Sequence, residues 1–396
     1  MRKILSILAA LLCAAACIYP YDFDLDENSD LKASLAVDGN ITIGAESTVL
    51  LGSVYPLKGV SGIQDATVFD FAKVWVEDDA GNVYMGKKSA KNLAPYAWGY
   101  ASFTIPTENA PADRRYRLCV DALGATYSSD WSDIPAPPVI RDIKFVADDN
   151  NVNVCVSVDG GESGTGYFLL SYDETWEFHS DYVPHYDVDT RFWRITEGDY
   201  DYSRYWCWKS VDTGRSYPVD YTGRTEQGVT DWMLLGFSRR DNRNHRRYCI
   251  NVKAKNLSST SYRFLKNLED NTGGGDNLFT PNPGEIPSNI RCDSNPDRMV
   301  YGYAVFGRSV SKRAFLDNRY LKAYPLYSLI YFPTAREYKE TCEFYWSQGF
   351  KPLKENPKQD YDPEEEGPYG WGPPECYDCI AAGGTQVRPD FWNEGL

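Results

Sequence analysis

Short stretches of alternating apolar and polar residues recur from Leu31 onward, and they constrain the fold more than any other feature of the chain. In VNVCVSVDGG, residues 152–161, the four valines share one parity and Cys155 has the opposite one. Successive side chains of a strand point to opposite faces of a sheet, so this stretch predicts a strand with one buried face. Many such stretches are separated by turn residues, for example Leu123-Gly124, which predicts an all-β fold of antiparallel sandwiches.

A proline-rich segment divides these strands into two groups. Each proline of Pro135-Ala136-Pro137-Pro138 fixes φ and removes a backbone donor, which predicts a stiff linker. We therefore expect two β-sandwich-like domains in tandem, an N-terminal Ig-like β-sandwich at 31–134 and a second β-rich domain at 139–325. The length of the chain supports this division, since one core rarely serves so many residues.

Local patterns predict further details of both domains. LAVDGNITI, residues 35–43, predicts two short strands joined by a turn at Asp38-Gly39-Asn40. GYFLLSYDE, residues 166–174, predicts a partner strand for 152–161. One short helix is expected in the second domain near 259–269, where Ser258 or Ser259 can cap it and apolar residues follow at helical spacing. Residues 326–396 are rich in Pro, Gly and Tyr, which predicts an irregular C-terminal extension.

The N-terminus predicts export and lipidation. MRKILSILAALLCAAAC has two cations, a short apolar run and small residues before Cys17. This layout is typical of a signal peptide, and the apolar run is too short to span a membrane. We predict a lipoprotein signal peptide at 1–16, lipidation of Cys17 and an acidic tether at 17–30, so that acyl chains hold the protein on a membrane face. The alternative is an ordinary signal peptide with an incidental cysteine.

The charge of the chain excludes one class of partner. Its 41 basic and 56 acidic residues give a formal net charge of −15. A nucleic-acid-binding protein needs a cationic surface to neutralise phosphates, so we expect no nucleic acid partner. The charge does not identify any other partner, because acidic exported proteins are often simply soluble.

Sequence motifs for catalysis are largely absent. The chain has no serine nucleophile elbow, no phosphate-binding loop and no HExxH, and it has only three histidines. We therefore expect a protein that is not an enzyme and that carries no cofactor. A carboxylate-based, glycan-active enzyme stays an alternative, but no pair among the 56 acidic residues stands out.

Two groups of polar residues have residue types that bind metal ions. One group shares a single strand parity, namely His179, Asp181, His185, Asp187 and Asp189. Pro184 interrupts that strand, so we expect a solvated strand face and no metal site. The other group is Asp22, Asp24 and Asp26, which lacks the glycine of a calcium loop and predicts a solvated linker instead.

Aromatic residues are concentrated between Tyr167 and Phe237. They alternate there with charges and hydroxyl groups, a mixture that stacks on sugars or packs against peptides. The candidate ligand platform consists of Trp176, Tyr182, Trp193, Tyr205 and Trp206. The alternative is a structural role, because Tyr and Trp favour strands and half of each strand faces a core.

Eight cysteines follow Cys17, and export makes disulfides the default for them. Cys376 and Cys379 form a close pair near the C-terminus, in a loop-like context that favours neither zinc nor a redox helix. We predict that one of the two bonds Cys342 or another distal cysteine, with Cys207 and Cys292 as further candidates. Such a bond would pin the tail to the second domain, with Trp371, Phe391 and Trp392 as packed anchors, and would stabilise by ~3–4 kcal/mol.

The sequence blocks taken together resemble a known family. They are the segment ending at Cys17, LAVDGNIT, AKVWVEDDAGN, the proline linker, CWKS at 207–210, NLSSTSYRFLKNLE, the block from LFTPNPGEIPSNIRCDSNP to SVSKRAF, and CYDCIAAGGTQVRPDFW. With these blocks the chain resembles the Bacteroidota outer-membrane lipoproteins grouped as domain of unknown function 4249. The family has no assigned catalytic residues.

The resemblance implies a lipid-anchored outer-membrane protein on the cell surface or on the periplasmic face. Genes of such proteins often lie near those of TonB-dependent transporters, which implies help with uptake. We therefore expect a non-catalytic accessory or substrate-capture subunit of a transporter, with a glycan or peptide as its ligand. A purely structural cell-surface adaptor is the alternative.

Overall fold

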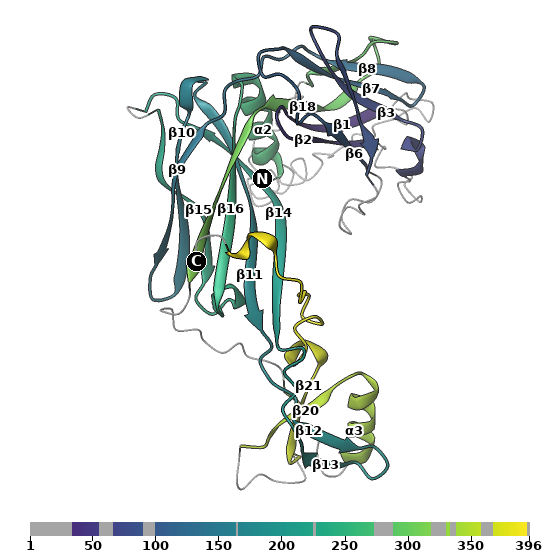
Figure 1. Ribbon diagram of the computed structural model, residues 1–396. Helices are drawn as coiled ribbons and strands as arrows, with labels where there is room; N and C mark the ends of the chain where they lie inside the picture. The colour runs from purple at the N-terminus through teal and green to yellow at the C-terminus, as the bar shows by residue number, and fades with distance from the viewer. Residues whose placement is uncertain are drawn as a thin grey trace, which may run out of the picture.

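Strands form most of the molecule, which is elongated (Figure 1). Two sandwich domains lie at one end, and a smaller distal lobe lies at the other. The computed structural model describes residues 34–54, 66–89, 100–163, 165–224, 227–272, 288–317, 330–332, 338–357 and 367–393. The predicted signal peptide at 1–16, Cys17 and the tether at 17–30 lie outside the described residues. The all-β prediction is confirmed.

The N-terminal sandwich consists of two five-stranded sheets, with strand orders β18-β1-β2-β6-β5 and β17-β8-β7-β3-β4. Its strands are β1 (Ser34–Thr42), β2 (Glu46–Val54), β3 (Lys73–Asp78), β4 (Val83–Met85), β5 (Lys87–Lys88), β6 (Ala101–Pro106), β7 (Tyr116–Ala122), β8 (Ala125–Ser129), β17 (Ile290–Cys292) and β18 (Val300–Gly307). The alternating apolar residues of both sheets, such as Leu35, Val74 and Leu118, meet in one buried core.

β1 is a single strand, so the turn predicted at Asp38-Gly39-Asn40 is wrong. The strand passes straight through these residues and pairs with β2 on one side and with β18 on the other. A Cβ at Gly39 would lie only 3.2 Å from Ala304 and Leu118, so the close packing here favours glycine. Turn-forming residues therefore sit within the strand because of a tertiary contact.

Two strands of the N-terminal sandwich come from late in the sequence. β18 pairs in parallel with β1, and β17 pairs with β8, although both follow the second domain in the chain. The boundaries predicted at 31–134 and 139–325 assign these two late strands to the second domain, whereas they pair within the N-terminal sandwich. The chain passes between the sandwiches three times: after β8, through α2, and between β18 and β19. The late strands cover edges that would otherwise expose unpaired backbone groups.

The second sandwich packs a three-stranded sheet, β15-β10-β9, against a four-stranded sheet, β14-β11-β16-β19. Its strands are β9 (Val139–Ala147), β10 (Asn151–Asp159), β11 (Tyr167–His179), β14 (Trp206–Asp220), β15 (Gly228–Ser238), β16 (Arg247–Asn256) and β19 (Ser309–Asp317). The valines at 152, 154, 156 and 158 are buried as predicted. β11 is not their partner, however, because it lies in the opposite sheet and pairs with β14 and β16.

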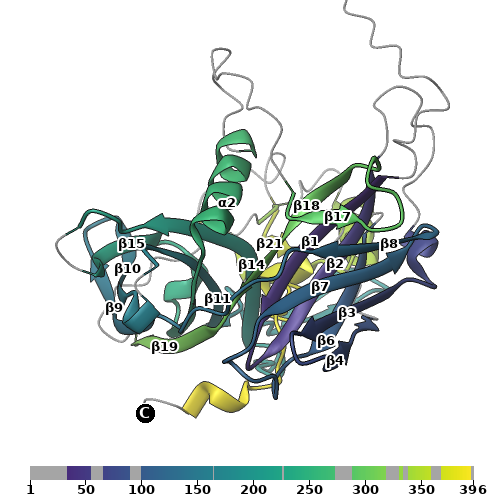
Figure 2. The ribbon, with the colours of Figure 1, turned by 90° about the horizontal axis from the view of Figure 1, so that it is seen from above.

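The predicted helix is α2 (Ser259–Thr272), and it stands between the two sandwiches (Figure 2). Ser258 is its cap, since its hydroxyl accepts a hydrogen bond from the Ser261 N–H at 3.1 Å. Tyr262, Phe264 and Leu265 pack with buried Leu257, Tyr303 and Val305 in a small apolar cluster. This cluster joins the helix to the outer face of β18 and to the start of β11.

The distal lobe lies beyond the far ends of β11 and β14 (Figure 1). It contains β12 (Tyr186–Asp189), β13 (Arg194–Glu197), α3 (Tyr338–Ser347), β20 (Lys351–Glu355) and β21 (Tyr369–Gly372). Three of these elements belong to the tail predicted to be irregular at 326–396, so that description is wrong for them. Trp371 is fully buried there, and burying a large aromatic ring favours ordered packing over a loose extension.

Short 3-10 helices complete the described part of the chain. They span Ala66–Phe69, Gly161–Ser163, Asn242–Asn244, Pro374–Cys376 and Asp390–Asn393. Among the described residues, neither α2 nor α3 nor any other helix is both long and apolar enough to cross a membrane.

Candidate ligand site between the sandwiches

The five aromatic residues of the predicted platform do not share one surface. Trp176 lies in the core of the second sandwich with only 5% of its surface exposed. Tyr205 and Trp206 are half-buried and contact each other, with ring centroids 5.2 Å apart. Tyr182 is half-buried near the tail, where its N–H donates to the Cys376 carbonyl at 3.0 Å. Trp193 lies in the turn between β12 and β13, so the structure separates what the sequence places together.

A series of ring contacts instead connects the second sandwich with the distal lobe; we call it the ring series. Its successive centroid distances are 4.6 Å for His245–His179, 4.9 Å for His179–Tyr205, 5.6 Å for Tyr205–Tyr202, 6.3 Å for Tyr202–Tyr200, 4.4 Å for Tyr200–His185, 4.0 Å for His185–Tyr186 and 5.3 Å for Tyr186–Tyr369. Most of these spacings are those of packed aromatic pairs. The series therefore connects the two parts through side-chain packing.

The histidines of the ring series are used for packing. Burial, with His179 nearby, lowers the pKa of His245 to about 4, so this ring is neutral at pH 7. Within the described ranges, no three His, Cys, Asp or Glu side chains come together as metal ligands. His179 and His185, which share a strand parity in the sequence, are each packed against tyrosine rings.

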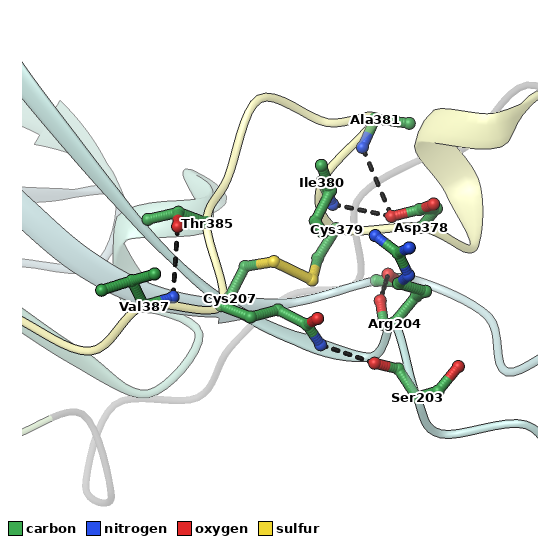
Figure 3. Close-up of a disulfide and its surroundings, with 11 residues drawn as sticks. Ser203, Arg204, Cys207, Asp378, Cys379, Ile380, Ala381, Thr385 and Val387 are labelled. Atoms are coloured by element: carbon green, nitrogen blue, oxygen red, sulfur yellow. Dashed lines mark hydrogen bonds between the residues drawn. A yellow bond between two sulfur atoms is a disulfide. The ribbon is translucent and has the colours of Figure 1, made fainter.

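A disulfide between Cys207 and Cys379 pins the tail to β14 (Figure 3). Around it, Trp208 and Thr385 exchange two backbone hydrogen bonds of 2.8 Å, and the Cys379 N–H donates to the Arg204 carbonyl at 3.0 Å. The predicted link from the close pair to a distal cysteine is thus confirmed, with Cys207 as the partner. Cys342 and Cys376 are both buried in the distal lobe, and Cys292 is buried in the N-terminal sandwich.

The tail anchors lie in two places. Trp371 is buried in the distal lobe, and Trp392 is buried against the second sandwich, where its carbonyl accepts a hydrogen bond from Arg247. Phe391 is half-buried beside Trp392, with ring centroids 6.4 Å apart. The tail therefore contacts both parts of the molecule that the ring series connects.

A cavity of about 770 Å³ lies where the two sandwiches and α2 meet, and we call it the junction cavity. Its walls come from β1 and β18 of the N-terminal sandwich, from β11, β14 and β16 of the second sandwich, and from α2. Ligand pockets are commonly found at domain interfaces and have volumes of roughly 300–1,000 Å³. A second cavity of about 510 Å³ also borders α2, near Trp131 and Arg263.

Apolar side chains form much of the wall of the junction cavity. Tyr303 stacks on Phe264 at a centroid distance of 4.5 Å, and Tyr172, Tyr301, Leu169 and Val305 also line the space. The two rings belong to β18 and α2, so the same contact holds the helix and shapes the wall. These rings contribute aromatic surface to the wall of the junction cavity.

Lys255 holds Asn40, a polar residue of the wall of the junction cavity, although Lys255 itself does not line the cavity. This β16 residue is only 5% exposed, and its Nζ donates to Asn40 Oδ1 at 2.5 Å, to Thr42 Oγ1 at 2.7 Å and to the Ile41 carbonyl at 3.2 Å. Its side chain thus crosses from the second sandwich to β1. The hydrogen bond from Lys255 to Oδ1 fixes the orientation of the Asn40 amide, whose nitrogen carries two donors that a ligand can use.

Two ionisable groups near Asn40 have shifted pKa values. Burial lowers the pKa of Lys255 to about 7, since desolvation disfavours the ammonium form. Asp38 keeps solvent-accessible surface at the cavity wall, but the surrounding protein desolvates it and raises the pKa of its carboxyl group. The cavity is thus a place where water is partly displaced by protein, which strengthens hydrogen bonds to a bound molecule.

Sequence reasoning did not find the junction cavity. Its residues come from six elements that are separated by up to about 270 positions, and no local spacing relates them. Lys255 has the parity of the outward face of β16, where a lysine normally meets water. A glycine inside a strand, such as Gly302, is a local signal of close backbone approach: its φ of +96° favours glycine, and a Cβ there would lie 1.8 Å from the Val37 carbonyl oxygen.

Comparison with known proteins identifies the family but no function. A search of curated proteins returned no match. A family model described as "Domain of unknown function (DUF4249)" matches residues 18–313, a range that runs from before β1 into β19 and includes the α2 helix. Because the match covers most of the chain, this protein belongs to the DUF4249 family.

Proposed function

We propose that this protein is a non-catalytic, lipid-anchored capture protein of the outer membrane that serves a TonB-dependent transporter. The observation that carries the proposal is the junction cavity, whose volume of about 770 Å³ and mixed lining are those of a ligand pocket. The signal-like N-terminus with Cys17 supports the membrane anchor, and the family resemblance supports the link to uptake.

The most buried carboxylate among the described residues supports a non-catalytic role. Glu174 is 1% exposed, and its two oxygens accept hydrogen bonds from the Tyr248 hydroxyl at 2.7 Å and from Arg243 at 3.3 Å. Desolvation raises the pKa of Glu174, a shift that is often seen in catalytic acids. Here the group is committed to its neighbours inside the core of the second sandwich, where a structural role accounts for the shift.

Pull-down from solubilised outer membranes tests the proposal. The tagged full-length protein should recover a TonB-dependent transporter, and the Cys17→Ser variant should lose membrane association and recover less of it. Metabolic labelling with a palmitate analogue checks lipidation directly. Repeated recovery of the wild-type protein alone, from membranes in which it is lipidated, would count against the transporter link.

A structural adaptor is the second candidate, and the ring series favours it. The burial of Trp176 and the packing of the ring series show that many of the aromatics serve the framework. An adaptor would recover the transporter equally well when the junction cavity is filled, whereas a capture protein with a filled cavity would keep the transporter but lose ligand delivery. Uptake measured in cells that carry a cavity-filling variant separates the two.

A further inference from the structure

We propose that the junction cavity binds a short, neutral oligosaccharide. This inference rests on the proposed function, because it names the ligand class of the same site. Three properties of the wall lead to it: the balance of its charges, the aromatic faces that it presents, and the fixed orientation of its hydrogen-bonding groups.

The charged side chains that line the junction cavity are balanced in number. The ionisable groups Asp38, Asp212, Arg215 and Lys253 line it, two acidic and two basic. Lys253 also pairs with Asp173, with 2.7 Å between Nζ and Oδ1. An anionic or cationic ligand would need an excess of the opposite charge to repay its desolvation. The lining therefore favours a ligand without net charge.

The aromatic faces of the wall suit a sugar ring. Tyr303 and Phe264 stack at 4.5 Å, and Tyr301 and Tyr172 line the cavity from β18 and β11. The face of an aromatic ring is electronegative, so it attracts the polarised C–H groups on the apolar face of a pyranose. Such contacts recognise the ring and leave its hydroxyl groups at the edge free to form hydrogen bonds.

The polar groups of the wall include both donors and acceptors, as hydroxyl groups require. Lys255 holds Asn40 through Oδ1, so the amide offers N–H donors, while Asp38, Ser171 and Ser216 add acceptors or hydroxyls. An acyl chain would leave these polar groups without partners, at a cost in binding free energy. A free peptide has charged ends, for which the balanced lining provides no excess charge.

Binding of defined neutral oligosaccharides tests the inference. The probes are uncharged tri- to hexasaccharides of glucose, mannose, xylose and galactose, measured by isothermal titration calorimetry with the full mature chain. We expect at least one probe to bind and Ser216→Trp, which fills the cavity from β14, to weaken its binding at least tenfold. Ser311→Trp is the matched control, since it places the same ring at an exposed serine on β19, the opposite edge of the same sheet.

A second variant tests the donor role of Asn40 without changing the shape of the side chain. Asn40→Asp keeps the acceptor for Lys255 but replaces the amide donors with an acceptor oxygen, so binding should weaken while the melting temperature stays close to that of wild type. Absence of binding for all probes, or binding that Ser216→Trp leaves unchanged, would overturn the oligosaccharide assignment.

A ligand-independent measurement separates this inference from the proposed function. Molecules that co-purify with the wild-type and Ser216→Trp proteins from the native envelope are extracted and compared by mass spectrometry. If the wild type retains a molecule other than a glycan and the variant does not, the capture function stands and the oligosaccharide class is wrong. If neither protein retains any molecule and no probe binds, both proposals fail.

Discussion

The ring series and the junction cavity both use aromatic side chains, but they use them in opposite ways. In the ring series, rings pack against rings from the second sandwich to the distal lobe. In the junction cavity, Tyr303 and Phe264 stack on each other and also line a space of about 770 Å³. A high density of aromatics in a sequence thus marks packing, whereas a pocket needs rings from separate elements that stop short of filling the space between them.

Because the ring series and the junction cavity are separate, we expect that substitutions can disrupt one and leave the other intact. The largest expected effect comes from removing the disulfide. Replacing both Cys207 and Cys379 with serine removes a link across 172 positions. The chain-entropy model predicts a loss of about 5 kcal/mol in the free energy of unfolding, measured by guanidinium denaturation. Limited proteolysis should then release the tail, while ligand binding in the junction cavity is retained.

Cys155→Ser is the control for the disulfide variant, because Cys155 is a half-buried residue of β10 remote from the tail. It should change the unfolding midpoint little. Peptide mapping without reduction should recover Cys207 joined to Cys379, and a map that joined Cys379 to another cysteine would contradict the structure.

Trp176 and Trp206 test which predicted platform residues belong to the core. Trp176→Ala should cost about 3–5 kcal/mol, because it opens a large cavity in the second sandwich. Trp206→Ala should cost only about 1–2 kcal/mol, since it loses ring contacts and the contact with Arg246 at 4.9 Å. Equal losses in chemical denaturation would mean that the ring series and the core are equally packed.

Lys255 joins the two sandwiches, and its contribution to the free energy of unfolding should depend on pH. The folded protein holds this pKa at about 7, below the ordinary value of 10.5, so between pH 7 and 10.5 the unfolded chain binds more protons. The contribution of Lys255 to stability should therefore rise with pH across this window, by up to a few kcal/mol at about 1.4 kcal/mol per pKa unit. The difference in unfolding free energy between wild type and Lys255→Met, measured at pH 7 and pH 10, isolates this contribution; a difference independent of pH would contradict it.

His245 gives the smallest expected effect, and it concerns the ring series. Its pKa of about 4 lies below the ordinary value of 6.5, so the unfolded chain binds more protons between these values. Wild type should therefore lose stability as pH falls from 6.5 to 4. His245→Phe, which keeps a ring but cannot be protonated, should lose about 1–2 kcal/mol less after allowance for partial exposure. Thermal melts at pH 7 and pH 4.5 measure the difference.

Periodicity predicted the elements well where the residues of one strand face one core. The valines of β10, the hairpin turn at Leu123-Gly124 and the helix behind Ser258 appear in the structure as predicted. The predictions that failed concerned which strands pair with each other. The motif Asp38-Gly39-Asn40 continues a strand because β18 returns to pair with it, and β11 joins the sheet opposite to the expected one.

The sequence alone determined the class of fold, the expectation of export and the expectation that the tail is bonded to a distal cysteine, because alternation, the apolar N-terminus and cysteine chemistry are local properties; the structure decided that Cys207, and not Cys342, is the partner of Cys379. Only the tertiary structure decided that Trp176 is core, that Lys255 crosses to β1, and that a cavity lies under α2. These features depend on pairings between residues far apart in the chain. Their free energy comes from burial and from hydrogen bonds made only after both partners are in place, so no local pattern encodes them.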